Sequence, residues 1–201
     1  TLADGEVTLN MSGVSDRVDG WLHDDKLYLR VVDYKTGRKA FSLSDVWYGM
    51  GLQMLLYLFA LERSGPARYG HEIVPAGVLY VPARDVLIPA DKEHAGAVRR
   101  SGVLLDVSAV LHAIELSDTP QYLPITPRRK TDALASAEQL GLLARHIETT
   151  LLDLAHELRG GSITADPYFR SGQDTACTHC DYLTVCHFTP GAGGDCHRVL
   201  T

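Results

Sequence analysis

A carboxylate and an ammonium group stand two residues apart in the segment Asp33-Tyr34-Lys35. Residues 27–32 before it read LYLRVV, and this β-branched and aromatic run is typical of a buried β-strand. Because side chains on a strand alternate between its faces, Asp33 and Lys35 would share one face. Such a pair could help to hold a divalent metal and to assist attack of water on a phosphodiester. By itself, the pair is more typical of a surface ion pair at a strand end, because the pattern Asp-x-Lys is common.

A second acidic segment, residues 13–19 with the sequence GVSDRVD, lies upstream. A hairpin turning near residues 23–26 would bring Asp16 beside the Asp33 strand. Two carboxylates and one lysine would then converge at one end of a sheet, which favours a metal-dependent hydrolytic site over a surface ion pair. Asp19 would lie on the opposite strand face, where a solvated carboxylate or a partner for Arg17 is an equal alternative.

A glutamine and a tyrosine, Gln53 and Tyr57, are four residues apart in a largely apolar segment. We predict a buried helix from an N-cap at Ser44 to about Glu62, ended by the Gly-Pro pair at 65–66. The spacing places Gln53 and Tyr57 on one helix face, one turn apart. From the residues alone, a hydrogen-bonded core amide and a core tyrosine explain the pair at least as well as a site does.

All four cysteines lie near the C-terminus, at positions 177, 180, 186 and 196. This clustering favours metal or cluster ligation over a disulfide framework, which would scatter the cysteines along the chain. The pattern Cys177-x-x-Cys180 forms a chelating loop for a soft metal. Zinc is one candidate, and its tetrahedral site could be completed by one of four further residues: His179, His187, Cys196 or His197.

The remaining pattern alternates strands and helices. We predict strands at 7–11, 16–22, 27–35, 75–81 and 86–88, helices at 106–116 and 132–159, a loop at 120–130 and an irregular tail from 162. The length suits one domain, and we expect its core to span residues 1–161, with the cysteine segment 162–201 packed on the same domain. Since the chain starts without Met, we expect a fragment of a longer protein.

The composition is that of an ordinary globular domain, with 201 residues, 45% hydrophobic and 22% charged. We expect a cytoplasmic protein, because neither an apolar run of about 18 residues nor a secretory signal is visible. The net charge of −6 argues weakly against nucleic acid as a partner. Metal bound at a carboxylate-rich site would offset part of that charge, and partner subunits could supply further grip on DNA. The sequence has no Walker motif, so we expect no ATP site.

Taken together, Gly13-x-x-Asp16, Asp33-Tyr34-Lys35 and Gln53-x-x-x-Tyr57 resemble the motifs of the PD-(D/E)XK nucleases of RecB type. The resemblance extends to the AddB-type nuclease domains, which belong to the B subunit of bacterial ATP-dependent helicase/deoxyribonucleases. It implies a restriction-endonuclease-like α/β core, in which helices flank a mixed central sheet. It also implies an exonuclease that processes linear single- or double-stranded DNA ends in double-strand-break repair, beside a partner subunit of a helicase-nuclease complex.

The resemblance also assigns roles to residues. It implies that Asp16 and Asp33 bind Mg²⁺ or Mn²⁺, that Lys35 is catalytic, and that Gln53 and Tyr57 lie beside the active site. Many such nucleases also take an acidic residue or a histidine from a helix before the first strand, and this chain shows no such residue.

For the cysteines, the resemblance implies that Cys177, Cys180 and Cys186 are three ligands of a 4Fe-4S cluster. The fourth ligand in that family precedes the nuclease core, and no cysteine precedes Cys177 here. The cluster could therefore be incomplete, lost, or completed by Cys196. Two alternatives to the nuclease remain: a non-catalytic module that binds DNA or a subunit and is stabilised by zinc or an iron-sulfur site, and a structural zinc domain.

Overall fold

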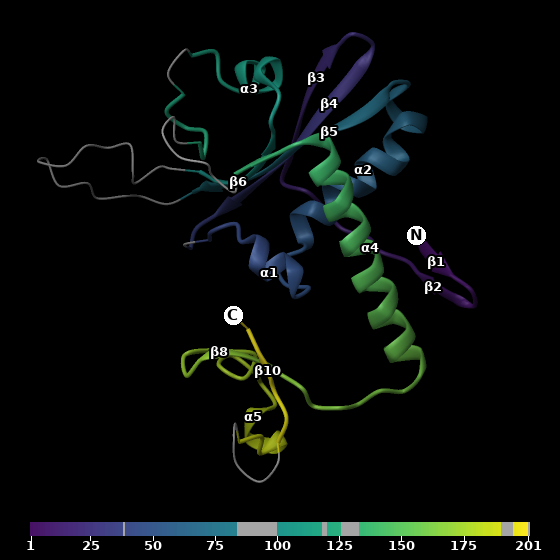
Figure 1. Cartoon of the computed structure of the whole chain (residues 1–201), viewed down its shortest axis with the longest axis vertical. Coiled ribbons are helices and arrows are strands. Elements are labelled where there is room, and N and C mark those ends of the chain that lie inside the picture. The colour runs from purple at the N-terminus through teal and green to yellow at the C-terminus, as the bar shows by residue number, and fades with distance from the viewer. Residues whose placement is uncertain (38, 84–99, 118–119, 126–132, 190–194, 201) are drawn as a thin grey trace, which may run out of the picture. The chain divides into compact units, whose positions relative to one another are not determined.

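The computed structural model of the chain describes residues 1–37, 39–83, 100–117, 120–125, 133–189 and 195–200 (Figure 1). Contacts divide the chain into two compact units, Thr1–Leu152 and Asp153–Thr201. The first unit contains the central sheet, and the second contains the four cysteines. No helix in the described ranges is both long and apolar enough to span a membrane.

The central sheet of the first unit is mixed, as predicted. Its five strands lie in the order β3 (Arg17–His23), β4 (Lys26–Lys35), β5 (Glu72–Pro82), β6 (Ser101–Leu105) and β7 (Leu134–Ala135). The pairs β3–β4 and β5–β6 are antiparallel, whereas β4–β5 and β6–β7 are parallel. The predicted hairpin is present, and it turns through Asp24 and Asp25, whose φ angles are 48° and 61°.

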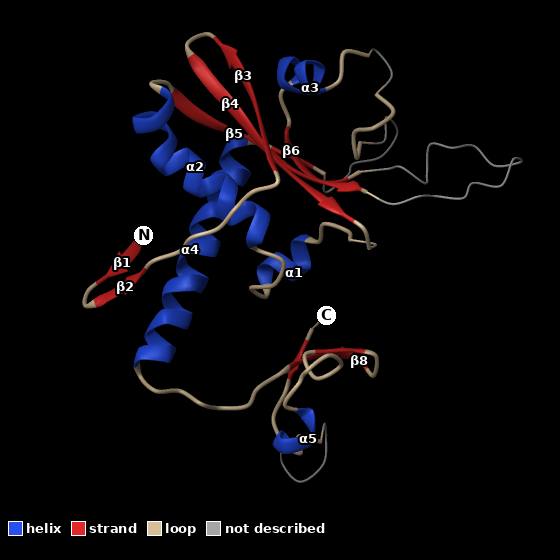
Figure 2. Ribbon diagram, turned by 180° about the vertical axis from the view of Figure 1, so that it is seen from behind, coloured by secondary structure: helices blue, strands red, loops and turns tan. Residues whose placement is uncertain are grey.

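Helices cover both faces of this sheet (Figure 2). On one face, Val78 and Tyr80 of β5 share a core cluster with residues of α2 (Gln53–Tyr69) and α4 (Ala137–Arg159). On the other face, Leu79 packs in a cluster that includes Leu111 of α3 (Ser108–Ile114). The alternation along β5 therefore buries successive side chains in two separate cores, which explains why this strand is apolar almost throughout.

The single helix predicted from Ser44 to Glu62 is wrong, because the segment forms two helices, α1 (Leu43–Trp47) and α2. Ser42, rather than Ser44, caps α1, and its Oγ accepts the Asp45 N–H at 3.1 Å. Gly49 and Gly51 separate the helices with φ angles of 81° and 66°. Glycine adopts this left-handed conformation readily, so the two glycines interrupt the apolar pattern.

The predicted stop at Gly65-Pro66 is also wrong, since α2 continues to Tyr69 and ends at Gly70 with φ 74°. A Cβ on Gly65 would lie 2.6 Å from Ile73 Cγ1, so this glycine permits close packing of α2 on β5. Pro66 lies in the last turn of α2, where its carbonyl accepts the Gly70 N–H at 2.9 Å.

Several boundaries differ from the sequence prediction. The first strand, expected at 7–11, is β2 (Val7–Leu9), and it pairs with β1 (Leu2–Asp4), which was not expected. Strand β5 begins three residues before Pro75, and the β4–β5 register shifts between Leu29 and Arg30, next to the pairing of Leu29 with this proline. The helix predicted at 106–116 is the shorter α3, while the strand predicted at 86–88 lies outside the described residues.

The long helix α4 begins five residues later than predicted. Ser136 Oγ accepts the Gln139 N–H at 3.2 Å, and Gln139 Oε1 accepts the Ser136 N–H at 2.8 Å. This reciprocal capping box fixes the start of α4 at Ala137. The residues before it form strand β7, which, like β6, the sequence analysis did not predict.

After the end of α4, the second unit consists of very short elements, in line with the predicted irregular tail. Strands β10 (Arg198–Val199), β8 (Tyr168–Ser171) and β9 (Asp174–Thr175) form a three-stranded sheet, and α5 (Leu183–Cys186) is one turn long. Arg198 Nε lies 2.5 Å from Asp166 Oδ2, and the rings of Phe169 and His197 meet edge to face at 5.3 Å. These contacts tie the end of the described chain back to β8.

Candidate active site at the end of strand β4

The C-terminal end of β4 carries a buried charged pair. Asp33 is only 8% exposed, and its Oδ2 lies 2.8 Å from Lys35 Nζ. Apart from this ion pair, the buried Oδ2 atom has no partner among the described residues. An enclosed carboxylate oxygen with unused acceptor capacity fits a hard divalent cation, which prefers oxygen ligands. The chemistry of this position therefore suits a metal ligand better than a surface ion pair.

The neighbouring strand contributes a residue that the sequence analysis missed. In the parallel pairing of β4 and β5, Tyr80 lies beside Asp33, and Lys35 Nζ is 5.9 Å from the centre of its ring. Burial raises the pKa of Tyr80, and the negative charge of Asp33 raises it further. Nothing in the sequence distinguished Tyr80 from a core tyrosine, because only the strand register places it here.

Asp16 lies immediately before β3, opposite the same end of β4. The last paired residues of the hairpin are Arg17 and Val32, and Asp16 Oδ2 accepts the backbone N–H of Tyr34 at 3.0 Å. The ammonium of Lys35 responds to both carboxylates: its pKa is raised first by its contact with Asp33 and, to a smaller extent, by the charge of Asp16. The hairpin therefore brings Asp16, Asp33 and Lys35 to one place.

Gln53 and Tyr57 form a hydrogen-bonded pair at the start of α2. Gln53 Nε2 donates to Tyr57 Oη at 3.1 Å, and Gln53 is exposed, which rules out the core-amide alternative. A Cβ placed on Gly13 would lie 2.5 Å from Tyr57 Cε1. The tyrosine ring thus packs directly on the backbone of the loop that leads to Asp16, and only glycine leaves room for it.

Asp19 has a structural role, as a partner for Arg17, which was the predicted alternative to a role in the site. It binds Arg17 at 2.6 Å and Arg30 at 2.5 Å, and Arg17 also donates to Tyr34 Oη at 3.1 Å. Burial favours a higher pKa for Asp19, but the hydrogen bonds from Arg30 and Arg17 outweigh it and lower the pKa. By strand alternation, Arg30 and Tyr34 lie on the face of β4 opposite Asp33, so this network is separate from the candidate site.

The cysteines lie in the second unit. Cys177 is half-buried, while Cys180, Cys186 and Cys196 are exposed. The Cys180 N–H donates to the Cys177 carbonyl at 3.2 Å, so the first two thiols flank one tight turn. These thiolates have the donor chemistry for a soft metal. In the part of the chain that the structure describes, however, no three His, Cys, Asp or Glu side chains are grouped as a metal site.

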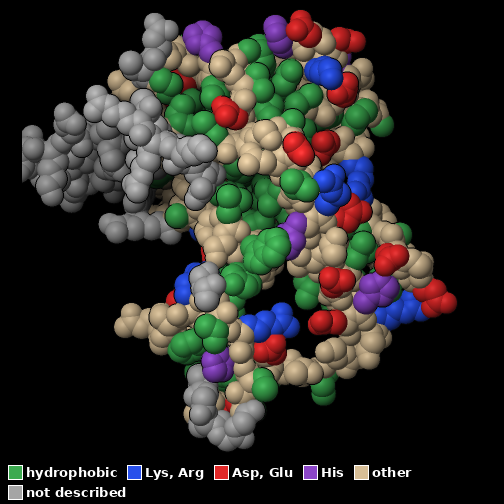
Figure 3. Space-filling view, in the orientation of Figure 1, with side chains coloured by type: hydrophobic (Ala, Val, Ile, Leu, Met, Phe, Trp, Pro, Cys, Tyr) green, Lys and Arg blue, Asp and Glu red, His purple; other side chains and the backbone are tan. Residues whose placement is uncertain are grey.

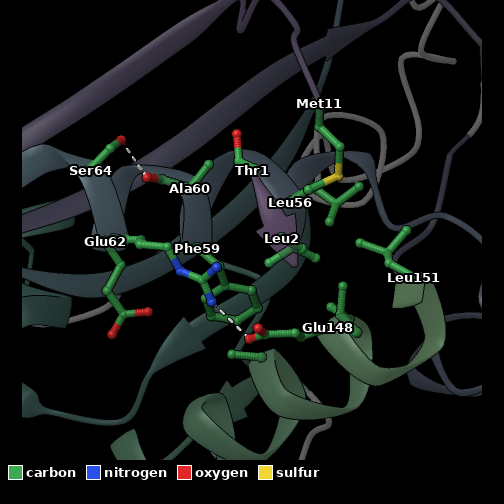
Figure 4. Close-up of a pocket in the computed structure, with 13 residues that line it drawn as sticks. Thr1, Leu2, Met11, Leu56, Phe59, Ala60, Glu62, Ser64, Glu148 and Leu151 are labelled. Carbon is green, nitrogen blue, oxygen red and sulfur yellow. Dashed lines mark hydrogen bonds and ion pairs between the residues drawn. The ribbon is translucent and has the colours of Figure 1, made fainter. Parts of the chain in front are cut away.

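A cavity of about 500 Å³ lies elsewhere in the first unit, between α2, α4 and the N-terminal strand (Figure 4). Leu2, Phe59 and Leu151 give it apolar walls, and the ion pair between Arg63 and Glu148 (2.8 Å) crosses one side. None of the five predicted catalytic residues lines it. The cavity is therefore distinct from the candidate site.

Comparison of the sequence with known proteins identifies a family and several relatives of this chain. Residues 2–187 match the family described as the PD-(D/E)XK nuclease superfamily. Three relatives are each named as the B subunit of an ATP-dependent helicase/deoxyribonuclease. They come from Thermoanaerobacter sp. (strain X514; 33% identical over 99% of this chain), Moorella thermoacetica (35% over 94%) and Acetivibrio thermocellus (33% over 90%). The chain spans only 17–18% of the length of these relatives.

Proposed function

The chain belongs to the PD-(D/E)XK nuclease superfamily, and from this premise we propose that it is a metal-dependent deoxyribonuclease domain. One observation carries the proposal: the buried Asp33 carboxylate, paired with Lys35, lies at the end of β4 that Asp16 also reaches. Two carboxylates can hold a divalent metal, and a neighbouring ammonium can stabilise charge on a phosphate, so together these groups suit metal-assisted hydrolysis of a phosphodiester.

In this proposal, Asp16 and Asp33 hold Mg²⁺, or Mn²⁺ in its place. Once bound, such an ion neutralises charge on the phosphate and lowers the pKa of a bound water molecule. Lys35 stays protonated at neutral pH because both carboxylates favour its charged form. It therefore acts through its positive charge and its N–H donors, stabilising the charge that develops on the phosphate.

Gln53 and Tyr57 support the site from α2. The Tyr57 ring packs on Gly13 and so fixes the loop that carries Asp16, while Gln53 holds the tyrosine hydroxyl. The exposed Gln53 side chain is also available to contact a water molecule or the DNA. On these contacts, we infer that the pair positions the site.

The names of the relatives support a proposal for the biological setting. Because they are named as the B subunit of an ATP-dependent helicase/deoxyribonuclease, we infer that this domain works beside a partner subunit in the cytoplasm. There it would act as an exonuclease on linear DNA ends during double-strand-break repair, while the helicase activity resides outside this chain.

The cysteine segment has a structural part in the proposal. Cys177, Cys180 and Cys186 would supply three thiolates to a 4Fe-4S cluster, with the fourth ligand outside this chain or at Cys196. Zinc remains the alternative metal. In either case, the bound group stabilises the tail and takes no part in hydrolysis.

The test is degradation of end-labelled linear single-stranded DNA in Mg²⁺ by three proteins: the unaltered chain, Lys35→Ala and Lys26→Ala. Lys26 is a matched control, because it lies on the same strand and pairs with Glu72 at the other end. We expect Lys35→Ala to lose at least about 100-fold in rate and Lys26→Ala to cleave normally. Equal rates for Lys35→Ala and the unaltered chain would contradict the proposal, and DNA binding without cleavage in all three would favour the non-catalytic module.

A further inference from the structure

Helix α1 presents a large aromatic side chain to solvent. Trp47 is 67% exposed, although one face of its indole is covered by the imidazole of His146 on α4. The ring centres are 4.6 Å apart and the planes differ by only 5°. The exposed area therefore includes the opposite face of the indole, which is flat and apolar.

The indole is held firmly from behind. His146 Nε2 lies 3.0 Å from the Trp47 carbonyl oxygen, so the imidazole contacts both the ring and the backbone of Trp47. The adjacent Val46 is fully buried in the core. A Cβ on Gly49 would lie 3.3 Å from Thr150 of α4, so the chain after α1 also runs close to that helix. A tryptophan fixed in this way loses little further freedom when a ligand stacks on it.

The same segment borders the candidate active site. The chain passes through α1 on its way from Lys35 to Gln53, and Figure 1 shows α1 beyond the end of the sheet where β4 stops. Val46 and Leu52 belong to the core cluster that contains Tyr80, the neighbour of Asp33 and Lys35. Trp47 is thus the direct chain neighbour of a residue that packs in the same core cluster as Tyr80, which lies beside Asp33.

The charge distribution favours DNA binding through contacts to the bases rather than through ion pairs with the phosphates. The net charge is −6, and Figure 3 shows acidic and basic side chains interspersed on the described parts of the visible face. Contacts to phosphates alone need a concentration of basic groups. Stacking of nucleobases on aromatic rings needs none, and it accepts any base because every base has a flat face.

We propose that the exposed face of Trp47 stacks on an unpaired nucleobase of the DNA strand that occupies the active site. The proposal rests on the proposed nuclease function and deepens it, because it makes single-stranded DNA the form that this domain grips. Base pairing and stacking hide the faces of bases in a duplex, so the platform selects an unwound strand. His146 is a positioning residue, since it orients the indole from the covered side.

The chain contains its own control for this test. It has two tryptophans, and Trp21 also stacks on a histidine, His23, at 4.5 Å and 9°. Trp21 lies near the turn of the hairpin, at the other end of β3 from Asp16. In Trp21→Phe, all tryptophan fluorescence comes from Trp47, and in Trp47→Phe it comes from Trp21, so each indole can be followed separately.

We would titrate both variants with a short oligothymidine in EDTA, where no cleavage occurs. The expected result is quenching of Trp47 fluorescence in Trp21→Phe and none of Trp21 fluorescence in Trp47→Phe. An abasic oligomer of the same length, and a blunt duplex, should give no quenching. Quenching by the abasic oligomer, or none by oligothymidine, would overturn the proposal.

Affinity provides a second, independent readout. Trp47→Ala should weaken the Kd for oligothymidine by about 5-fold to about 100-fold, while Trp47→Phe should retain most of the affinity. Because stacking releases no counterions, the dependence of Kd on salt should keep the same slope in Trp47→Ala. An unchanged Kd, or a reduced slope, would overturn the proposal. Since the readout is binding, failure here leaves the Lys35→Ala cleavage test untouched, and the two proposals can fail separately.

Discussion

Two regions of this chain carry groups of metal-binding type, and they are built in different ways. At the end of β4, strand pairing itself sets the neighbours: Asp33 lies beside Tyr80, and Asp16 accepts the N–H of Tyr34. In the second unit, the cysteines lie among strands of two to four residues and one helical turn, and three of the four are exposed.

The difference shows what each region requires in order to form. Backbone hydrogen bonds and a buried core assemble the first region from the chain alone, so its acidic groups are positioned before any ion binds. Most described side chains of the second region are exposed, and small segments with little core are stabilised by a bound metal or by another cross-link. We therefore expect substitutions in the first region to change catalysis or hairpin stability, and those in the second to change metal content and melting temperature together.

The largest expected stability effect concerns Cys180→Ala. Loss of one thiolate should release the bound iron and lower the melting temperature by at least about 5 °C, with the active-site residues intact. The measurements are iron and labile sulfide per chain together with thermal unfolding of protein purified without oxygen. Cys196→Ala serves as the comparison, and normal iron content in it would place the fourth ligand elsewhere.

Full iron content and an unchanged melting temperature in Cys180→Ala would contradict this expectation, because neither metal binding nor stability would then depend on Cys180. Zinc in place of iron and sulfide would keep the comparison but change the identity of the metal.

The next effect tests whether the hairpin is held by its own contacts. Asp19→Ala leaves the buried Arg30 guanidinium without its partner and should reduce the free energy of unfolding by about 2 kcal/mol. Because the folded-state pKa of Asp19 is lowered, its contribution is present above about pH 4 and is lost as the pH falls through the folded pKa.

Urea unfolding at pH 7 and at pH 3 measures both expectations. The difference between Asp19→Ala and the unaltered chain should shrink at the lower pH. Glu72→Ala, which breaks an exposed ion pair on the neighbouring strand, should cost less at pH 7. If the two variants were equally stable, the Asp19 network would be an ordinary surface feature.

The smallest effect concerns the fit between α2 and the loop before Asp16. In Gly13→Ala, the new methyl group must displace the Tyr57 ring, which should lower the cleavage rate by about 10-fold through misplacement of Asp16. Gly37→Ala is the control, since its Cβ would meet no atom within 4 Å. Cleavage rates and melting temperatures should be measured for both. Normal cleavage by Gly13→Ala would contradict the proposal that Tyr57 positions the loop before Asp16.

The hairpin and its acidic end could be predicted from sequence because strand alternation is a short-range rule. It placed Asp33 and Lys35 on one strand and Asp16 beside it, within one residue of the observed strand ends. The family motifs supplied Gln53 and Tyr57. Tyr80 and Trp47 were not found, because their positions depend on pairing between distant strands and on contact with a helix 99 residues further along the chain.

The errors have a similar origin. The apolar run from Met50 to Leu61 hid the break at Gly49 and Gly51, since hydrophobic periodicity does not report the backbone angles of glycine. Gly65 was interpreted as a helix end, although its role is to let α2 approach Ile73 closely. Both errors concern glycines, whose meaning depends on the atoms that they face in the folded chain.

The most direct test of the central claim is Asp33→Asn, which removes the buried charge but keeps the shape of the side chain. Degradation of end-labelled single-stranded DNA should be measured for this variant and the unaltered chain over a range of Mg²⁺ concentrations, with thermal unfolding as the check on the fold. We expect Mg²⁺-dependent cleavage by the unaltered chain and none by a folded Asp33→Asn. Cleavage by Asp33→Asn at the unaltered rate would contradict the claim that this end of β4 is the active site.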